Sequence, residues 1–412
     1  MMEVNSLDDI SVTKKTVFLR VDFNMPLDKK TLEILDTTRM KRVLPTIKEL
    51  VSKQAKTVII AHQGRKGSWD FTSLKQHAKV FEKILGSKVS FVEDIYGKQA
   101  QQAIKELKFG EVLFLDNVRK LEYETEKKPA SEHAKTSFIQ HLAPLGDVFV
   151  NDAFAAAHRS QCSLIGFTPL LPSCAGRLMQ EEVTTLSRVM QNPEKPCVFL
   201  FGGAKYSDIM VTIERVLQNN TADQILLTGL PANAFLHAQG YNLGSGNKKA
   251  LLEEGNEELF SQIKTLMENY DDAIVLPTDF GIEQNGKRKQ ISVEDLPTDQ
   301  GLFDIGSETI KDYKKILKQA KTIFLSGPCG VFEQDIFMKG TKEIFTYVSE
   351  SEAFSIVGGG HTVAAVKQLN LQDHISHIST GGGSLEKFMM GEKLPVLEAL
   401  KQSKINQPIA TK

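Results

Sequence analysis

Short apolar runs alternate with longer amphipathic stretches along almost the whole chain of 412 residues. The runs are rich in β-branched and aromatic residues, which is typical of buried parallel strands. In the first half they cover residues 16–23, 57–61, 89–92, 112–115 and 148–150. In the second half they cover residues 197–201, 225–227, 273–276, 322–325, 354–357 and, as a shorter run, 375–378. Between the runs, apolar residues recur at the spacing of a helix face.

This alternation predicts an α/β protein with two doubly wound parallel-sheet (Rossmann-like) domains, a connector helix and a cleft between the domains. Ten or more strands are too many for one open sheet, and this number also argues against a single eight-fold barrel. Around residues 170–196, four prolines bracket a helix-period segment, which indicates a connector; a helix packed within one domain is the alternative. The prolines are Pro169, Pro172, Pro193 and Pro196.

We therefore expect a first domain at residues 1–172, a hinge at 173–196 and a second domain at 197–384. Residues 385–412 are expected to form a C-terminal helix and tail, for which packing against the first domain is one option. No repeat of fixed period and no low-complexity tract divides the chain further.

Composition excludes several function classes. The 50 basic residues balance 51 acidic ones, so no global field attracts nucleic acid or a membrane, and neither is expected as a partner. The acidic N-terminus and the lack of a long apolar run predict a cytoplasmic protein, as a monomer or small homo-oligomer. The four cysteines show no metal-binding spacing and are expected to be reduced and mostly buried. They are Cys162, Cys174, Cys197 and Cys329.

Cationic and amide side chains follow the strands of the first half. Ligands of open α/β sheets bind beyond the carboxyl ends of the strands, so these side chains are expected to converge on one small, strongly anionic ligand. The planar fork of arginine suits carboxylate and phosphate oxygens. Solvated surface residues or ion pairs, such as Arg20 with Asp22, are the alternative. The set comprises Arg20, Asp22, Asn24, Arg39, His62, Gln63, Arg65, Arg119, Asn151, His158 and Arg159.

Glycine turns follow the strands of the second half. Consecutive glycines bring bare N–H groups to an anion at a helix N-terminus, and a lysine adds a point charge, which together suit a polyphosphate. Tight packing of helix on sheet is the alternative, because neither G-x-G-x-x-G nor the P-loop pattern is present. The turns lie at Gly202–Lys205, Gly229, 327–330 and 358–360, and Glu333 is a candidate acceptor for ribose hydroxyls.

Cations in one half and glycine turns in the other predict an anionic metabolite and a nucleotide that meet across a cleft. Phosphoryl transfer suits this arrangement, because its catalysis is mostly positioning and charge stabilisation. A nicotinamide dinucleotide oxidoreductase would need G-x-G-x-x-G after an early strand and an acidic residue some twenty positions on, and neither is evident. A non-catalytic nucleotide- or metabolite-sensing protein is a second alternative.

The motifs resemble those of the phosphoglycerate kinase family over nearly the whole length of the chain. The AHQGR and GGGHT segments resemble the archaeal-type branch of that family. The resemblance implies reversible transfer of the acyl phosphate of 1,3-bisphosphoglycerate to ADP, giving 3-phosphoglycerate and ATP in glycolysis, with Mg²⁺ and hinge closure. The motifs are RVDFN (20–24), DTTR (36–39), AHQGR (61–65), DNVR (116–119), VNDAF…AHR (150–159), GGAK (202–205), GPCGVFE (327–333), AFSIVGGG (353–360) and HISTGGGS (377–384).

The resemblance also implies a role for each matching residue. Asp22 and Asn24 would hold the hydroxyl and carboxyl end of the ligand, and Arg39 and Lys205 would be catalytic. The phosphoglycerate site would comprise Asp22, Phe23, Asn24, Arg39, His62, Gln63, Gly64, Arg65, Arg119 and Arg159. The nucleotide site would comprise Gly202, Gly203, Ala204, Lys205, Gly229, Glu333, Gly358, Gly359, Gly360, His361 and Thr362.

The nucleotide side departs from the commonest pattern of that family. Leu230 and Pro231 stand where glycine and methionine are usual. Ile209 stands where a second lysine is expected, Ser326 where an asparagine is, and His361 where the aspartate linked to the metal is. Mg²⁺ prefers oxygen ligands, so His361 is a poor substitute. Thr362, Asp208 or Asp279 could supply oxygen, or phosphates and water could hold the metal. A degenerate relative that binds without turnover is the alternative, but the complete anion site and Lys205 favour an active kinase.

Overall fold

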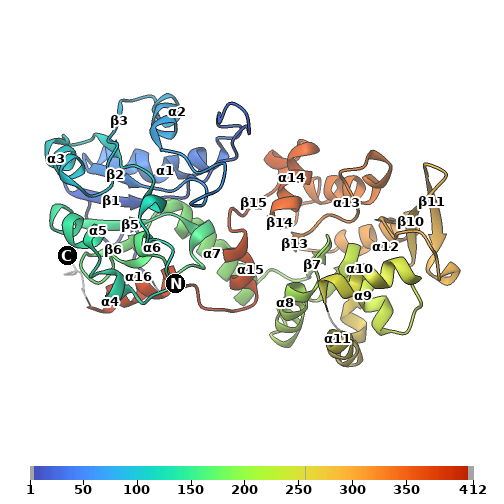
Figure 1. The fold of residues 1–412 in the computed structure, drawn as a ribbon. Helices are drawn as coiled ribbons and strands as arrows, with labels where there is room; N and C mark the ends of the chain where they lie inside the picture. The colour runs from blue at the N-terminus through green and yellow to red at the C-terminus, as the bar shows by residue number, and fades with distance from the viewer. Residues whose placement is uncertain (1–3, 256, 407–412) are drawn as a thin grey trace. The chain divides into compact units, whose positions relative to one another are not determined.

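The computed structural model describes residues 4–255 and 257–406, so residues 1–3, 256 and 407–412 of the expected domains lie outside the described part. The chain forms two compact units, Met1–Thr184 with Lys393–Lys412, and Thr185–Glu392. Each unit is built on a six-stranded sheet (Figure 1), and within each of these sheets all neighbouring strands are parallel. The expected α/β class is confirmed.

The first sheet has the strand order β3-β4-β2-β1-β5-β6. All five strands expected in this half are present, and their ends differ by at most three residues from the sequence prediction. The edge strand β6 was not predicted, because its three residues, Ser-Cys-Ala, give no apolar run, and it lies where the connector was expected to begin. The strands are β1 (Thr16–Arg20), β2 (Lys56–Ile60), β3 (Val89–Phe91), β4 (Val112–Phe114), β5 (Val148–Asn151) and β6 (Ser173–Ala175).

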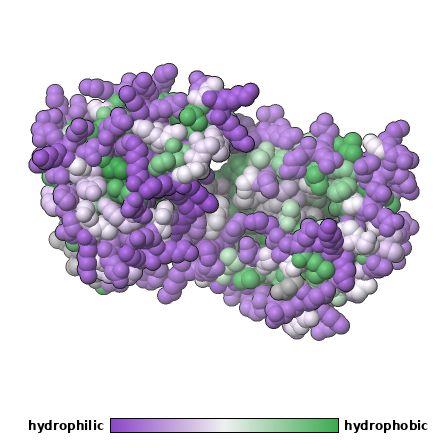
Figure 2. All heavy atoms as spheres, in the orientation of Figure 1, coloured by the Kyte–Doolittle hydropathy of each residue, from purple (hydrophilic) through white to green (hydrophobic). Residues whose placement is uncertain are grey.

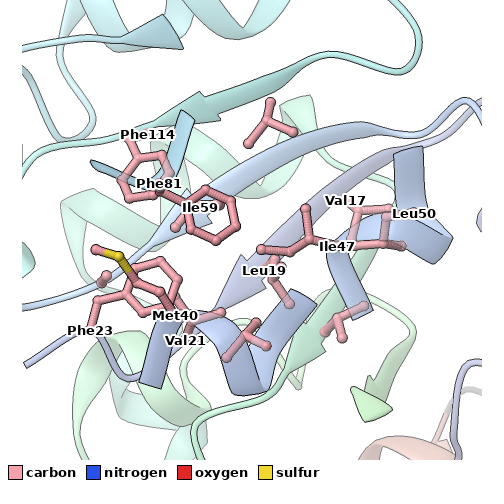
Figure 3. Close-up of a cluster of buried hydrophobic side chains, with 14 of the residues drawn as sticks. Val17, Leu19, Val21, Phe23, Met40, Ile47, Leu50, Ile59, Phe81 and Phe114 are labelled. Atoms are coloured by element: carbon pink, nitrogen blue, oxygen red, sulfur yellow. The ribbon is translucent and has the colours of Figure 1, made fainter. Parts of the chain in front are cut away.

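Helices cover both faces of this sheet, and the alternation of β1 shows why. Val17 and Leu19 contribute to one buried cluster, whereas Phe18 between them contributes to another. Figure 3 shows the first cluster, in which Phe23 and Met40 also lie. The helices of this unit are α1 (Thr38–Ser52), α2 (Lys75–Leu85), α3 (Lys98–Glu106), α4 (Ala130–His133), α5 (Ser137–Leu142) and α6 (Cys162–Ile165).

The second sheet has the order β15-β14-β13-β7-β8-β9. Its strands are β7 (Cys197–Phe201), β8 (Gln224–Leu227), β9 (Ile274–Val275), β13 (Thr322–Ser326), β14 (Phe354–Gly358) and β15 (His377–Ile378). Its helices are α8 (Ser207–Gln218), α9 (Gly229–Ala238), α10 (Ser245–Glu254), α11 (Glu257–Tyr270), α12 (Ser307–Leu317), α13 (Lys339–Ser349), α14 (Gly360–Gln368) and α15 (Gly383–Met389).

The sequence did not reveal a small antiparallel sheet in this unit, with the order β11-β10-β12. Its edge strand reads KRKQIS and buries only Ile291, so it gives no apolar signal. The strands are β10 (Asp279–Gln284), β11 (Lys287–Ser292) and β12 (Asp304–Ile305).

A helix does form in the expected connector. It is α7 (Arg177–Gln191), and the two units divide within it. The last helix, α16 (Pro395–Asn406), contacts α6 and β6, and the N–H of Val396 donates a 3.2 Å hydrogen bond to the carbonyl of Ala157. Among the described residues no helix is long and apolar enough to cross a membrane. The face shown in Figure 2 is mostly hydrophilic.

Candidate active site

An ion pair at the end of β1 begins the candidate site of the first unit. Asp22 accepts a hydrogen bond from the guanidinium of Arg39, which lies in the first turn of α1. The Nε2 atom of His62 lies 4.0 Å from the other carboxylate oxygen of Asp22. Burial alone would raise the pKa of Asp22, but the positive charge of Arg39 and further favourable contacts lower it. The carboxylate is therefore ionised at neutral pH.

Three arginines converge beside this pair. Arg65, Arg119 and Arg159 line one cavity of about 360 Å³. Arg119 is only 6% exposed and donates to the carbonyl of Gly64. Burial and the charge of Arg159 lower the pKa of Arg119 to about 10, which still leaves it charged at neutral pH. Lys66 and Glu122 also line this cavity and pair with each other at 3.4 Å, so the three arginines supply its excess positive charge, which suits a small polyanion such as a phosphate.

The loop that carries Arg65 is fixed by its neighbour Gly64. The Asn24 side chain accepts a 2.9 Å hydrogen bond from the Gly64 N–H, which leaves the amide NH₂ of Asn24 as a donor. Gly64 has φ +66°, and a Cβ there would lie 2.6 Å from the backbone of Asp70 and Phe71. This turn therefore requires glycine.

Two of the expected phosphoglycerate ligands have side chains that serve the fold. Phe23 is fully buried, with its ring centroid 5.5 Å from that of Phe81 (Figure 3). Gln63 is also fully buried, and its Oε1 accepts hydrogen bonds from the Met25 N–H at 2.8 Å and from Nε2 of His77 at 3.0 Å. These contacts position the loops that carry Phe23 and Gln63.

The second unit has a cavity of about 340 Å³ where its glycine turns meet. Eight of the expected nucleotide ligands line it: Gly202, Gly203, Ala204, Lys205, Gly359, Gly360, His361 and Thr362. Gly229, Gly358 and Glu333 are not part of the lining, and Glu333 is an exposed residue. Ile209 and Ser326, two of the departures from the usual family pattern, also line the cavity.

Backbone hydrogen bonds hold the glycine turns against one another. Gly202 donates to the carbonyl of Ser326 at 2.8 Å, and Gly327 donates to the hydroxyl of Thr362 at 2.7 Å. A Cβ on Gly327 would lie 2.1 Å from the Gly202 carbonyl oxygen. Likewise, a Cβ on Gly229 would lie 2.6 Å from the Gly203 carbonyl oxygen. Gly229 and Gly327 are therefore required for packing between the turns.

Other glycines leave backbone open toward the cavity. Gly359 has φ +88° and precedes Gly360, the first residue of α14, where nothing lies within 4 Å of an added Cβ. Lys205 is exposed and lies just before α8. Free amides at a helix N-terminus together with one lysine form an anion site.

The oxygen donors considered for a metal differ in their availability. The carboxylate of Asp279 accepts hydrogen bonds from the N–H groups of Glu308, at 3.1 Å, and Thr309, at 2.9 Å, and so caps α12. Asp208, by contrast, lines the cavity together with Glu386. Partial burial raises the pKa of Glu386, Lys205 lowers it, and Asp208 raises it. No cluster of three or more potential metal ligands occurs among residues 4–255 and 257–406.

Sequence reasoning missed the contribution of α15. Leu385, Glu386 and Met389 line the cavity, and Leu385 also packs where a Cβ of Gly358 would lie. The helix begins inside the HISTGGGS motif. Leu385 and Met389 lie four residues apart directly after that motif. This helical spacing could have indicated that α15 contributes to the cavity.

The chain is similar to known proteins over nearly its full length. Residues 7–392 match the family model described as phosphoglycerate kinase. A phosphoglycerate kinase from Methanobacterium bryantii is 44% identical over 400 residues, which cover 97% of this chain and 98% of that protein. One from Thermococcus onnurineus is 42% identical over 403 residues, which cover 96% of each. The crystal structure of phosphoglycerate kinase from Pyrococcus horikoshii OT3 superposes with a TM-score of 0.87 at 39% identity, covering 97% of this chain and 99% of that one.

Proposed function

Because this chain belongs to the phosphoglycerate kinase family, we propose that it transfers the acyl phosphate of 1,3-bisphosphoglycerate to ADP, reversibly, giving 3-phosphoglycerate and ATP. It is accordingly a phosphotransferase. The observation that carries the proposal is the convergence of Arg65, Arg119 and Arg159 on one cavity beside Asp22 and His62. The shape and positive charge of this cavity suit the phosphate that stays on the substrate.

The first unit holds the phosphoglycerate in this proposal. The three arginines that line the cavity bind the fixed phosphate, and His62, which Arg119 and Arg159 influence electrostatically, donates a hydrogen bond to the ligand. The ionised carboxylate of Asp22 accepts from the substrate hydroxyl, while the free amide NH₂ of Asn24 donates to the carboxyl end. Arg39, which is 40% exposed and held by Asp22, reaches the phosphoryl group in transit.

The second unit holds the nucleotide. The N–H groups at the start of α14 and the ammonium of Lys205 contact its phosphates. The attacking β-phosphate oxygen of ADP is already ionised, so no general base is required. The P–O bond to the carboxyl oxygen breaks as the new P–O bond forms. Arg39 on the phosphoglycerate side and Lys205 on the nucleotide side each supply positive charge that stabilises the negative charge on the transferring group.

The family generally uses a magnesium nucleotide, and we propose that Asp208 and Glu386 are the protein oxygens that hold Mg²⁺ here, together with phosphates and water. Both carboxylates line the nucleotide cavity, whereas Asp279 is committed to capping α12 and the Thr362 hydroxyl accepts from Gly327. Oxygen donors fit the preference of Mg²⁺. The bound ion would neutralise phosphate charge.

Calorimetry of ADP binding with and without Mg²⁺ tests this assignment. Asp208→Asn should reduce the gain in ADP affinity that Mg²⁺ provides, by roughly tenfold. Glu214→Gln is the matched control, because it removes one exposed carboxylate from the same helix outside the cavity. In His361→Asp the Mg²⁺ gain should increase. If Asp208→Asn and Glu386→Gln each keep the full Mg²⁺ gain, phosphates and water alone hold the metal.

Trapping of the acyl phosphate tests the activity itself. The protein is incubated with Mg-ATP, 3-phosphoglycerate and hydroxylamine, and the hydroxamate is measured. Product should form in proportion to enzyme, and not when 3-phosphoglycerate is omitted or the protein is boiled. The same experiment with Arg65→Ala should require much more 3-phosphoglycerate. No product above the boiled control would leave a binding protein without turnover.

A further inference from the structure

A chain of buried polar groups lies behind His62, starting at Arg20. Arg20 ends β1 and is fully buried. Its guanidinium donates to the Val21 carbonyl and to the Ser163 hydroxyl, the latter at 2.9 Å. Its remaining nitrogen, Nη2, lies 3.0 Å from Nδ1 of His62. Although Arg20 lies at a strand end and the cavity arginines follow strands, Arg20 is committed to protein partners.

The contact between Arg20 and His62 determines where the imidazole carries its proton. Arginine has five N–H donors and no acceptor, so Nδ1 of His62 must be the acceptor. The single proton of the neutral ring is then on Nε2. The carboxylate oxygen of Asp22 is 4.0 Å from Nε2, which is too far for a direct hydrogen bond. The Nε2–H is thus available to a ligand.

Ser163 and Glu124 complete the chain from the other side. The Ser163 hydroxyl accepts from Arg20 and donates its own proton to Glu124 at 2.6 Å. The second carboxylate oxygen of Glu124 accepts the backbone N–H of Ser163 at 2.9 Å. Glu124 is fully buried, and although burial raises its pKa, the charge of Arg20 and the hydrogen bonds from Ser163 lower it. In turn Glu124 favours the charged form of the buried Arg20 and acts as its counterion.

We propose that Arg20, Ser163 and Glu124 are positioning residues that lock His62 in the Nε2–H tautomer, as a neutral hydrogen-bond donor to the anionic metabolite. The inference rests on the proposed function for the identity of that metabolite. It assigns three residues that do not touch the substrate to substrate recognition.

Charges around the ring act in the same direction. Burial lowers the pKa of His62 well below its ordinary value, and Arg20, Arg119 and Arg159 lower it further, against the opposing effect of Asp22. A proton on Nδ1 would also face the guanidinium of Arg20. His62 therefore stays neutral, and its donor does not change across the physiological pH range.

Ring-nitrogen NMR of histidine-labelled protein without substrate tests the tautomer directly, with the His62 signals assigned from a His62→Asn protein. We expect Nε2–H, Nδ1 unprotonated and no titration between about pH 5.5 and 8. His77 is an internal reference, because its Nε2 must donate to Gln63 Oε1, which already accepts from Met25. A proton on Nδ1 of His62, or a pKa near the ordinary value, overturns the inference.

Ser163→Ala tests the positioning role. It should mix the His62 tautomers, leave those of His77 unchanged, and raise the KM for 3-phosphoglycerate by about tenfold with kcat changed less than about threefold. Glu124→Gln should act in the same direction if Ser163→Ala folds poorly. Unchanged tautomer and KM in a folded variant contradict the proposal. An inactive wild-type protein with the Nε2–H tautomer in place would instead contradict the proposed function.

Discussion

The hydroxyl of Thr46 donates a 2.6 Å hydrogen bond to the fully buried carboxylate of Asp152. The other carboxylate oxygen of Asp152 accepts the N–H of Met179 at 2.9 Å, in the first turn of α7. Asp152 thereby joins α1, which carries Arg39, to the start of α7. Burial raises the pKa of Asp152 to about 6, even though these hydrogen bonds favour the ionised form.

Asp152 should make the stability of the first unit depend on pH. Its folded-state pKa of about 6 lies above the ordinary 3.8, so between these values the folded protein binds the extra proton. The contribution of this group to the free energy of unfolding therefore falls as pH rises through that window, by up to about 1.4 kcal/mol per pH unit. Asp152→Asn should remove this contribution, as measured by urea unfolding at several pH values.

Asp312→Asn is the control for that measurement, because it removes a half-exposed carboxylate on α12. Its pH dependence should match that of the wild-type protein. If Asp152→Asn also follows the wild-type curve between about pH 4 and 6, the buried carboxylate does not carry the extra proton.

Replacing Arg39 should affect turnover more than binding. Its partner charge grows in the transition state, so Arg39→Ala should lower kcat by roughly 100-fold or more, while the Kd of 3-phosphoglycerate rises by less than about tenfold. Steady-state kinetics and calorimetry supply the two values. Lys41→Ala, an exposed cation on the same helix, should change neither. Equal losses in rate and affinity would assign Arg39 to ground-state binding.

Sequence patterning anticipated the parts of the fold in which burial is two-sided. Each expected strand is present because a strand covered on both faces is apolar throughout, as in β7. The pattern failed where burial is one-sided or the strand is very short. Neither β11, in which only Ile291 is buried, nor the three-residue β6 gives an apolar run, and only their neighbours in space define them.

The candidate sites could be predicted only where the type of a residue indicates its chemistry. Arginines after strands indicated an anion site, and Arg65, Arg119 and Arg159 do line one cavity. The sequence could not distinguish Arg20, which is fully buried, from these three. Nor could it show Glu386, whose place in the cavity depends on how α15 packs near α8.

The four cysteines should be unreactive in the folded protein, and burial explains why. All four are buried without a disulfide, as expected from the sequence. Burial raises the pKa of Cys162 and of Cys197 to about 12, so almost no thiolate is present at neutral pH. A colorimetric thiol reagent should label none of the thiols in native protein and all four in urea. Rapid labelling of the native protein would indicate local opening.

Gly360 offers the sharpest separation of binding from folding. Nothing lies within 4 Å of a Cβ added there, and its φ is not in the left-handed region, so Gly360→Ala should leave the free energy of unfolding unchanged or raise it by about 0.4–1 kcal/mol. The added methyl group would nevertheless face the phosphates at the start of α14. ADP affinity should therefore fall by roughly tenfold or more, as measured by calorimetry.

Gly246→Ala is the matched control, because this glycine also lies in the first turn of a helix, α10, with nothing within 4 Å of its Cβ. Both variants should be at least as stable as the wild-type protein, and only Gly360→Ala should bind ADP weakly. If Gly360→Ala binds ADP normally, the phosphates do not approach the α14 N-terminus. If both variants lose affinity equally, the effect comes from the helices and not from a contact with the nucleotide.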